Sequence, residues 1–364
     1  MWAMVVKEFR ELRRDRRTVA MMIVLPVVLL VVFGYAANFK VRDIPAVAVG
    51  PGARQAATFL RAPTFHVTEV DPAAGEPAAR ARLRDGQAVV AVVTGGGRPL
   101  VLLDGTQLFS VETAETALAR LAPAAGTPAP RVQILYDPEL TTSWVMVPGL
   151  AGLILVFIGT LITSLGVVRE RQSGTLEQLA VMPFRAWDVI AGKIAPYLMV
   201  AAVDLVLIIA IGMGVFHVPF AGNVGVFALG AALFLLVTLG MGVLISTVSQ
   251  NQGQAIQLAF MILLPQVLLS GLIFPVPSMA AGVRWISYVL PLTYFIEISR
   301  GVMLKAMPIT ALWQPLGLLA LLAVVVLGLA IIRFRRDLAP GARKERARPP
   351  AGQPAAAGAV GGTA

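Results

Sequence analysis

The sequence contains no cysteine and only two histidines, His66 and His217, among its 364 residues. Without cysteine the chain can form no disulfide framework and can present no thiolate metal site or cysteine nucleophile. Two histidines also provide no histidine-rich metal site. No Gly-x-x-x-x-Gly-Lys-Ser/Thr motif occurs, because Gly192-Lys193 is followed by isoleucine. The chain therefore lacks the P-loop that cradles nucleotide phosphates.

Charge is scarce and apolar residues are abundant. Charged residues make up 14% of the chain and hydrophobic residues 57%, and the mean hydropathy is +0.79. A soluble domain does not tolerate this composition on its surface, so a soluble enzyme is excluded. Thirty Lys and Arg against twenty Asp and Glu leave a net charge of +10. A basic excess of this size is consistent with binding to nucleic acid, binding to anionic lipid, or a bias of charge to one side of a membrane. The positions of the charges along the chain distinguish these explanations.

Long uncharged runs predict six membrane-spanning helices, since about 20 apolar residues cross a hydrocarbon core of about 30 Å. The first run covers residues 18–39, the second 141–168 and the last 309–333. Between the last two, the polar, turn-rich segments 217–223 and 249–254 separate three more helices. These are predicted at 188–214, 224–248 and 255–274.

The basic residues indicate the orientation of these helices. They gather before the first helix, over residues 169–193 after the second, and over 333–348 after the last. If six helices alternate, all three groups face the cytoplasm, as the positive-inside rule requires. Both termini are then cytoplasmic, the basic excess reflects topology, and nucleic acid is not an expected partner. A cleavable signal peptide is the alternative for the first helix, but its flank carries acidic residues and five spans follow.

The remaining segments have distinct compositions. Residues 1–17 place apolar and basic side chains on opposite sides of a helix, which predicts an interfacial elbow helix bound to membrane lipid. Residues 40–140 have a soluble composition and alternate apolar runs with helical stretches, so we expect a small α/β extracytoplasmic domain. Within it, Asp104-Gly105-Thr106 is typical of a turn that closes a strand. The tail over 334–364 is basic and too poor in large apolar residues to fold.

The segment over 169–187, between the second and third spans, predicts a short capped helix. Thr175 and Gln178, three residues apart, form a capping box, and Pro183 ends the element. Its small apolar face, which includes Leu179, has few neighbours in so short a loop. We therefore expect that face to bind a partner protein; contact with interfacial lipid is the alternative.

These residues also form a recognisable pattern. The coupling segment, as we call residues 169–187, and the start of the next helix carry Arg169-Glu170, Gly174 to Leu179, Pro183 and Gly192-Lys193-Ile194-Ala195-Pro196. Further motifs are Tyr136-Asp137-Pro138, Val147-Pro148-Gly149, Gln254-Ala255, Leu264-Pro265, Ser270-Gly271 to Pro275, Pro291 to Tyr294, Arg300-Gly301 and Lys305. Together they resemble the type-2 ABC transporter permeases, and the large domain after the first span is similar to the drug-export branch. Two positions depart from the pattern: Ala280 stands where proline is usual, and Ala306 where glycine is usual.

The resemblance implies a half-transporter of the bacterial inner membrane that exports a drug, lipid or other amphiphile. Two permease copies, identical or close paralogues, would pair. Separate cytoplasmic ATPase subunits would bind ATP-Mg and grip the coupling segment, so this chain would hold no ATPase site or cofactor of its own. The resemblance also allows a periplasmic adaptor protein as a further partner. The implied ATPase contacts are Glu170, Gly174, Thr175, Leu176, Glu177, Leu179 and Pro183.

Asp204 is the single formal charge between residues 194 and 283. A rise of about 1.5 Å per residue puts it roughly 22 Å into the third helix, where a bare carboxylate costs up to about 2.5 to 3.5 kcal/mol. We therefore expect it to face protein or a water-filled path. It is either a cargo or proton site or the partner in a helix-packing hydrogen bond.

Residues 275–305 carry aromatic side chains that suit short re-entrant helices at the outer face, although aromatic belts alone would explain them. The resemblance implies that such helices cap the translocation path. With the fifth helix broken near Pro265, this cap would form an outer gate. The candidate path and gate residues are Asp204, Pro265, Gly271, Phe274, Pro275 and Tyr294.

Two other classes of function remain open. An ion-coupled secondary transporter usually needs several intramembrane ionisable or unwound sites, and Asp204 alone is thin support for one. A membrane-anchored sensor or scaffold would use the external domain for a ligand. An intramembrane hydrolase is weaker still, because no span holds a histidine with a nucleophile or a pair of carboxylates.

Overall fold

The computed structural model describes residues 43–60, 64–95, 97–121, 130–173 and 186–338. The predicted elbow helix, the first span, most of the coupling segment and the tail beyond residue 338 lie outside these ranges. Helices dominate the described residues, which confirms the prediction of a mostly helical membrane protein.

Five helices of the described residues are long and apolar enough to cross a membrane. They are α6 (Thr142–Gln172), α8 (Ala186–Val215), α9 (Val224–Val248), α10 (Gln252–Leu269) and α13 (Trp313–Leu338). The remaining predicted span, the first one at residues 18–39, falls outside the described ranges. Polar breaks separate α8, α9 and α10, and in each break an asparagine caps the next helix. Asn223 accepts hydrogen bonds from the N–H groups of Gly225 and Val226, and Asn251 accepts one from Gln254.

Helix α10 differs from its prediction at the outer end. It runs through Pro265 without interruption and ends at Leu269, so the predicted break near Pro265 is wrong. Pro265 removes one backbone hydrogen bond, yet the following turn is held by burial of Gln266 and Leu268. The helix ends instead where Gly271 adopts a φ of +89°, a conformation that favours glycine.

An α/β domain precedes α6. Its strands β1 (Ile44–Val49), β2 (Phe65–Asp71), β3 (Val90–Val93), β4 (Leu100–Asp104) and β5 (Arg131–Leu135) form one sheet in the order β2-β1-β3-β4-β5. Neighbouring strands are parallel except β3 with β4. Helices α3 (Ala53–Phe59), α4 (Glu76–Arg84) and α5 (Leu108–Leu121) connect the strands. Alternate strand residues supply two apolar clusters, one with α5 and one with α4, so both faces of the sheet are covered.

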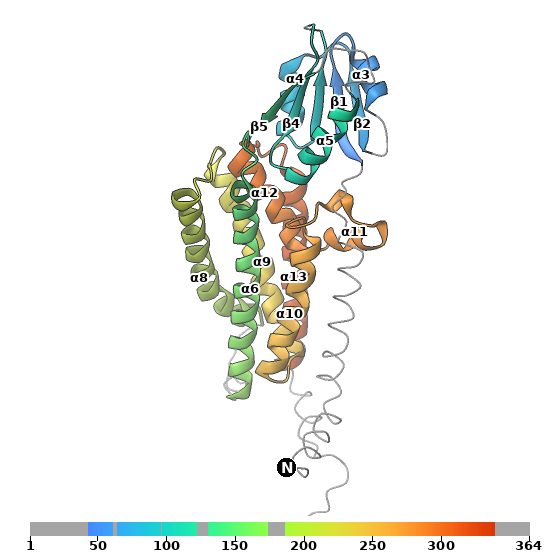
Figure 1. The fold of residues 1–364 in the computed structure, drawn as a ribbon. Coiled ribbons are helices and arrows are strands. Elements are labelled where there is room, and N and C mark those ends of the chain that lie inside the picture. The colour runs from blue at the N-terminus through green and yellow to red at the C-terminus, as the bar shows by residue number, and fades with distance from the viewer. Residues whose placement is uncertain (1–42, 61–63, 96, 122–129, 174–185, 339–364) are drawn as a thin grey trace, which may run out of the picture.

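The α/β domain lies at one end of the helical bundle (Figure 1). Within the bundle, α9 packs along both α6 and α13. Three short elements follow α10: η2 (Val276–Ser278), α11 (Ala281–Ser287) and α12 (Pro291–Lys305). Helix α12 packs against α6, α9 and α13 at the end of the bundle next to the domain (Figure 1). The position of this end outside the cytoplasm stays a prediction.

Candidate functional site

The last turn of α6, at its predicted cytoplasmic end, contacts the turn between α9 and α10. Nη1 of Arg171 donates to the carbonyl oxygens of Ser246 at 2.9 Å and Ser249 at 3.1 Å, where α9 ends. The side-chain oxygen of Gln172 accepts a hydrogen bond from Nε2 of Gln252 at the start of α10, at 3.1 Å. The terminal carbonyl groups of a helix have no partner within it, and a cation beside them is favourable. Arg171 therefore caps the C-terminal end of α9 and links it to α6.

Glu170 extends the same contacts to α8. Its carboxylate forms an ion pair with Nζ of Lys193, whose side chain is 12% exposed. Glu170 itself, predicted as an ATPase contact, keeps 40% of its side chain exposed and so remains within reach of a partner. The other predicted contacts lie outside the described residues: Gly174, Thr175, Leu176, Glu177, Leu179 and Pro183.

At the other end of the bundle, two of the predicted gate residues, Phe274 and Tyr294, are buried in different apolar clusters. Phe274 is buried together with residues of α10, the turn after it and α11. Tyr294 is buried at the start of α12, and its hydroxyl donates to the carbonyl oxygen of Tyr288 at 2.5 Å. Oε1 of Gln266 in α10 accepts a hydrogen bond from the N–H of Leu292 in α12 at 3.3 Å. The cap over 275–305 is thus fixed to α10, and its role as a gate stays a prediction.

Helix α12 is also fixed to α6 and α9. Nε of Arg300 donates to the carbonyl oxygen of Val145 at 2.9 Å. The Phe295 ring stacks on Phe234 of α9 with their centroids 4.3 Å apart. A Cβ atom at Gly152 of α6 would lie 2.5 Å from Cδ1 of Phe295, so this crossing requires glycine. Movement of α12 must therefore repack both neighbours.

Asp204 lies on the side of α8 that faces α6. Seven residues before it, Tyr197 touches Gly166, and eight residues after it, Gly212 lies against Val147. Seven residues are close to two helical turns, so Asp204 lies on nearly the same side of α8 as Tyr197, whereas Gly212 lies about 80° further round the helix. Asp204 is partly exposed, and its carboxylate makes no hydrogen bond or ion pair with another described residue. A helix-packing hydrogen bond is therefore not found within the described part of the chain.

A cavity of about 750 Å³ lies between α8 and α9. Every side chain that lines it is apolar, including Leu205 and Met213 from α8 and Phe227 and Leu235 from α9. The volume is within the range of small-molecule sites. Asp204 does not line this cavity.

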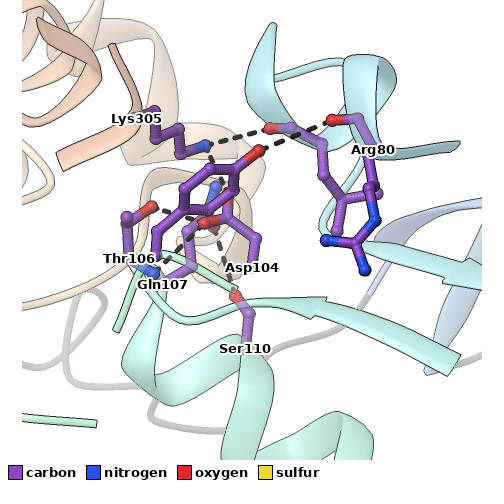
Figure 2. Close-up of polar contacts among 8 residues, drawn as sticks. Arg80, Asp104, Thr106, Gln107, Ser110 and Lys305 are labelled. Carbon is purple, nitrogen blue, oxygen red and sulfur yellow. Dashed lines mark hydrogen bonds and ion pairs between the residues drawn. The ribbon is translucent and has the colours of Figure 1, made fainter. Parts of the chain in front are cut away.

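A buried ion pair joins the α/β domain to α12. Nζ of Lys305 contacts Oδ2 of Asp104 at the end of β4 (Figure 2). Asp104 also makes the predicted turn, because the N–H and hydroxyl of Thr106 donate to its Oδ1. The sequence analysis did not find the pair, since its members are 201 residues apart and no local motif links them.

Apolar crossing helices, a polar contact network at one end and a cap of short helices at the other are typical of a polytopic membrane protein. Residues 16–332 match the ABC-2 family transporter protein domain. The chain therefore belongs to the ABC-2 transporter family.

Relatives with similarity along almost the whole chain carry permease names. The chain is 28% identical over 363 residues to the probable multidrug ABC transporter permease YbhR of Escherichia coli K12, which covers 93% of this chain and 99% of that protein. It is 27% identical over 368 residues to the probable multidrug ABC transporter permease YbhS of the same strain, with 92% and 97% covered. A shorter stretch of 160 residues is 29% identical to ABC transporter G family member 20 of Dictyostelium discoideum, covering 44% of this chain and 22% of that protein. The predicted family resemblance is confirmed: the chain is an ABC transporter permease, a transmembrane subunit of a family whose members partner with ABC ATPase subunits.

Proposed function

We propose that this chain forms the translocation path of an ATP-driven exporter in the bacterial inner membrane. Two copies, identical or closely related, make the path, and separate ATPase subunits bind ATP-Mg and hydrolyse the nucleotide. The cargo class is an amphiphile such as a drug or a lipid. The multidrug names of the relatives and the apolar cavity between α8 and α9 support this cargo class.

The observation that carries the proposal is the contact network directly before residue 174. The end of α6 contacts three helices: Arg171 binds the end of α9, Gln172 binds the start of α10, and Glu170 binds α8. A displacement of the coupling segment therefore reaches three membrane helices at once. An ATP-driven permease needs such a connection, whereas a sensor whose ligand binds the α/β domain does not.

The variant Gly174→Pro/Glu177→Arg tests the ATPase partnership. The proline fixes φ in the turn that enters the predicted helix and disfavours the helical conformation of the residue before it, and the arginine reverses a charge on the proposed contact face. We expect a P-loop ATPase to co-purify with the tagged wild-type chain from native membranes in gentle detergent, and to be lost from this variant.

Glu112→Arg, a charge reversal at an exposed position of α5, is the matched control and should retain the ATPase. Recovery of the same ATPase with the Gly174→Pro/Glu177→Arg variant would refute the assignment of the coupling segment. Absence of any ATPase from the wild-type dimer would favour the ion-coupled or sensor alternatives.

Asp204→Asn tests the proposal that Asp204 is a cargo or proton site on the path. Asparagine keeps the size and hydrogen-bonding capacity but removes the charge. We expect ethidium export to fall roughly tenfold, equivalent to about 1.4 kcal/mol, with a normal amount of protein in the membrane. Asp188→Asn, in the first turn of the same helix, is the control. Unchanged export by Asp204→Asn at normal expression would exclude the cargo and proton roles.

A further inference from the structure

The contact between Lys305 and the α/β domain involves three parts of that domain. Besides Asp104 on β4, Nζ of Lys305 donates to the carbonyl oxygen of Leu83 in α4 at 3.3 Å. The ring of Tyr136, which follows β5, has its centroid 5.9 Å from the same nitrogen. Burial, together with the charge of Asp104, raises the pKa of Tyr136 to about 12, so this ring stays uncharged. One ammonium group at the end of α12 therefore holds three elements of the domain.

Both charged groups of the pair are almost completely enclosed. The side chain of Lys305 is 7% exposed and that of Asp104 is 0% exposed. Asp104 is saturated, because Oδ1 accepts two hydrogen bonds from Thr106 while Oδ2 faces the ammonium group (Figure 2). Removal of one partner while the contact stays closed would leave the other charge buried and unpaired, which is strongly unfavourable.

The end of α12 directs Lys305 toward the domain. Ala306 adopts a left-handed conformation with φ of 51°, and the N–H of Met307 donates to the carbonyl oxygen of Gly301 at 3.0 Å. This closes the helix directly after Lys305, and it explains why glycine suits position 306 in the family pattern. Met307 then lies against the domain, because a Cβ atom at Gly86 would be 3.7 Å from its Cε.

A buried ion pair contributes little net stability compared with apolar side chains of the same size, but it accepts only one docking arrangement. Here that arrangement fixes the domain to the helix that Arg300 and Phe295 hold against α6 and α9. A rigid contact here would make the domain follow any movement of α12 and would pass any force on the domain to α12.

We propose that Lys305 and Asp104 are positioning residues that make the α/β domain and α12 one mechanical unit, through which the domain sets the position of the cap. The part of this proposal that concerns the gate rests on the proposed function. The mechanical part depends only on the contacts between the domain and α12.

The absence of cysteine from the chain makes the test direct, because introduced cysteines are the only thiols available for spin labels. Labels at Glu112→Cys in α5 and Val289→Cys just before α12, both exposed positions, report the distance between domain and cap. The full chain is reconstituted in lipid discs with its ATPase subunits, and labelled copies are diluted with unlabelled ones. We expect one narrow distance distribution, the same with and without a non-hydrolysable ATP analogue.

The neutral double variant Lys305→Met/Asp104→Asn removes both charges while keeping an acceptor for Thr106, so no unpaired charge is left buried. In this variant we expect the distribution to at least double in width. The control, Arg80→Met/Glu76→Gln, removes a half-exposed ion pair within α4, together with the hydrogen bond from Arg80 to Gln133, and should leave the distribution narrow. A second label pair within the domain, at Arg54→Cys and Glu112→Cys, checks that the domain stays folded.

An unchanged narrow distribution in the neutral double variant would overturn the proposal. So would a wild-type distance that shifts when the nucleotide binds, since domain and cap would then move separately. Broadening within the domain itself would show that the pair holds only the fold of the domain, and would also overturn it. Ethidium export by the neutral double variant should fall roughly tenfold. If no ATPase co-purifies with the wild type, the proposed function fails, whereas the distance measurements in lipid discs still decide whether domain and cap form one unit.

Discussion

Replacing Gly242 with leucine is expected to abolish the stable packing of α6 against α9. A Cβ atom at this position would lie 2.7 Å from Cβ of Thr163 and 2.8 Å from the carbonyl oxygen of Thr160. The second of these atoms belongs to the backbone of α6, so it cannot rotate away as the end of a side chain can. In membranes, small residues stabilise helix pairs because they allow the backbones this close. The leucine must force the two helices apart.

We expect this overpacking to cost about 3 kcal/mol or more and to lower the midpoint of thermal unfolding in detergent strongly. The measurement is size-exclusion chromatography of heated samples, detected by a fluorescent tag. Gly214→Leu is the matched control, because nothing lies within 4 Å of a Cβ atom at that exposed position of α8. A Gly242→Leu variant that elutes and melts as the wild type does would show that α6 and α9 do not pack as described.

The positions of the five described membrane helices could be predicted because an uncharged run of about 20 residues has few alternatives in a lipid bilayer. The contacts between these helices could not. The sequence contains no Gly-x-x-x-Gly motif in a span, which predicts that dimerisation uses larger side chains or extended faces. Single glycines such as Gly152 and Gly242 nevertheless make close crossings within one chain. A single glycine is not part of a repeating sequence motif, so only the structure shows which helix it touches.

The same limit applies to the polar contacts. Lys305 and Asp104 are 201 residues apart, and Arg171 is 75 residues from Ser246. No local pattern records such pairs, whereas the helix caps at Asn223 and Asn251 bond residues only two or three positions away and fall in polar breaks visible in the sequence. Strand β5 is also hard to predict from the sequence, because it is an edge strand whose first three residues are exposed, so its apolar signal is weak. The break near Pro265 was wrong because neighbouring helices override the local effect of proline.

Arg171→Met is expected to separate ATP hydrolysis from transport. The substitution keeps much of the apolar stem but removes the guanidinium group that donates to two carbonyl oxygens at the end of α9. A hydrogen bond to a charged group contributes about 1.5 to 3 kcal/mol, so a coupling energy equal to one of the two bonds corresponds to a roughly 10- to 100-fold fall in export. The proposed ATPase contacts lie mainly after residue 173, so the ATPase subunits should still co-purify and hydrolyse ATP at the basal rate.

The measurement compares ethidium export with ATP hydrolysis in the same vesicles. Arg169→Met is the matched control, because Arg169 is an exposed arginine in the same turn of α6, and removing its charge should leave export unchanged. Arg171→Lys should fall between the two, since an ammonium group lacks the planar fork of the guanidinium. Equal export by Arg171→Met and Arg169→Met would mean that α9 takes no part in transmission. Loss of the ATPase from Arg171→Met would instead place Arg171 at the subunit contact itself. A fall in export with the ATPase still bound would show that the end of α6 passes movement of the coupling segment to α9.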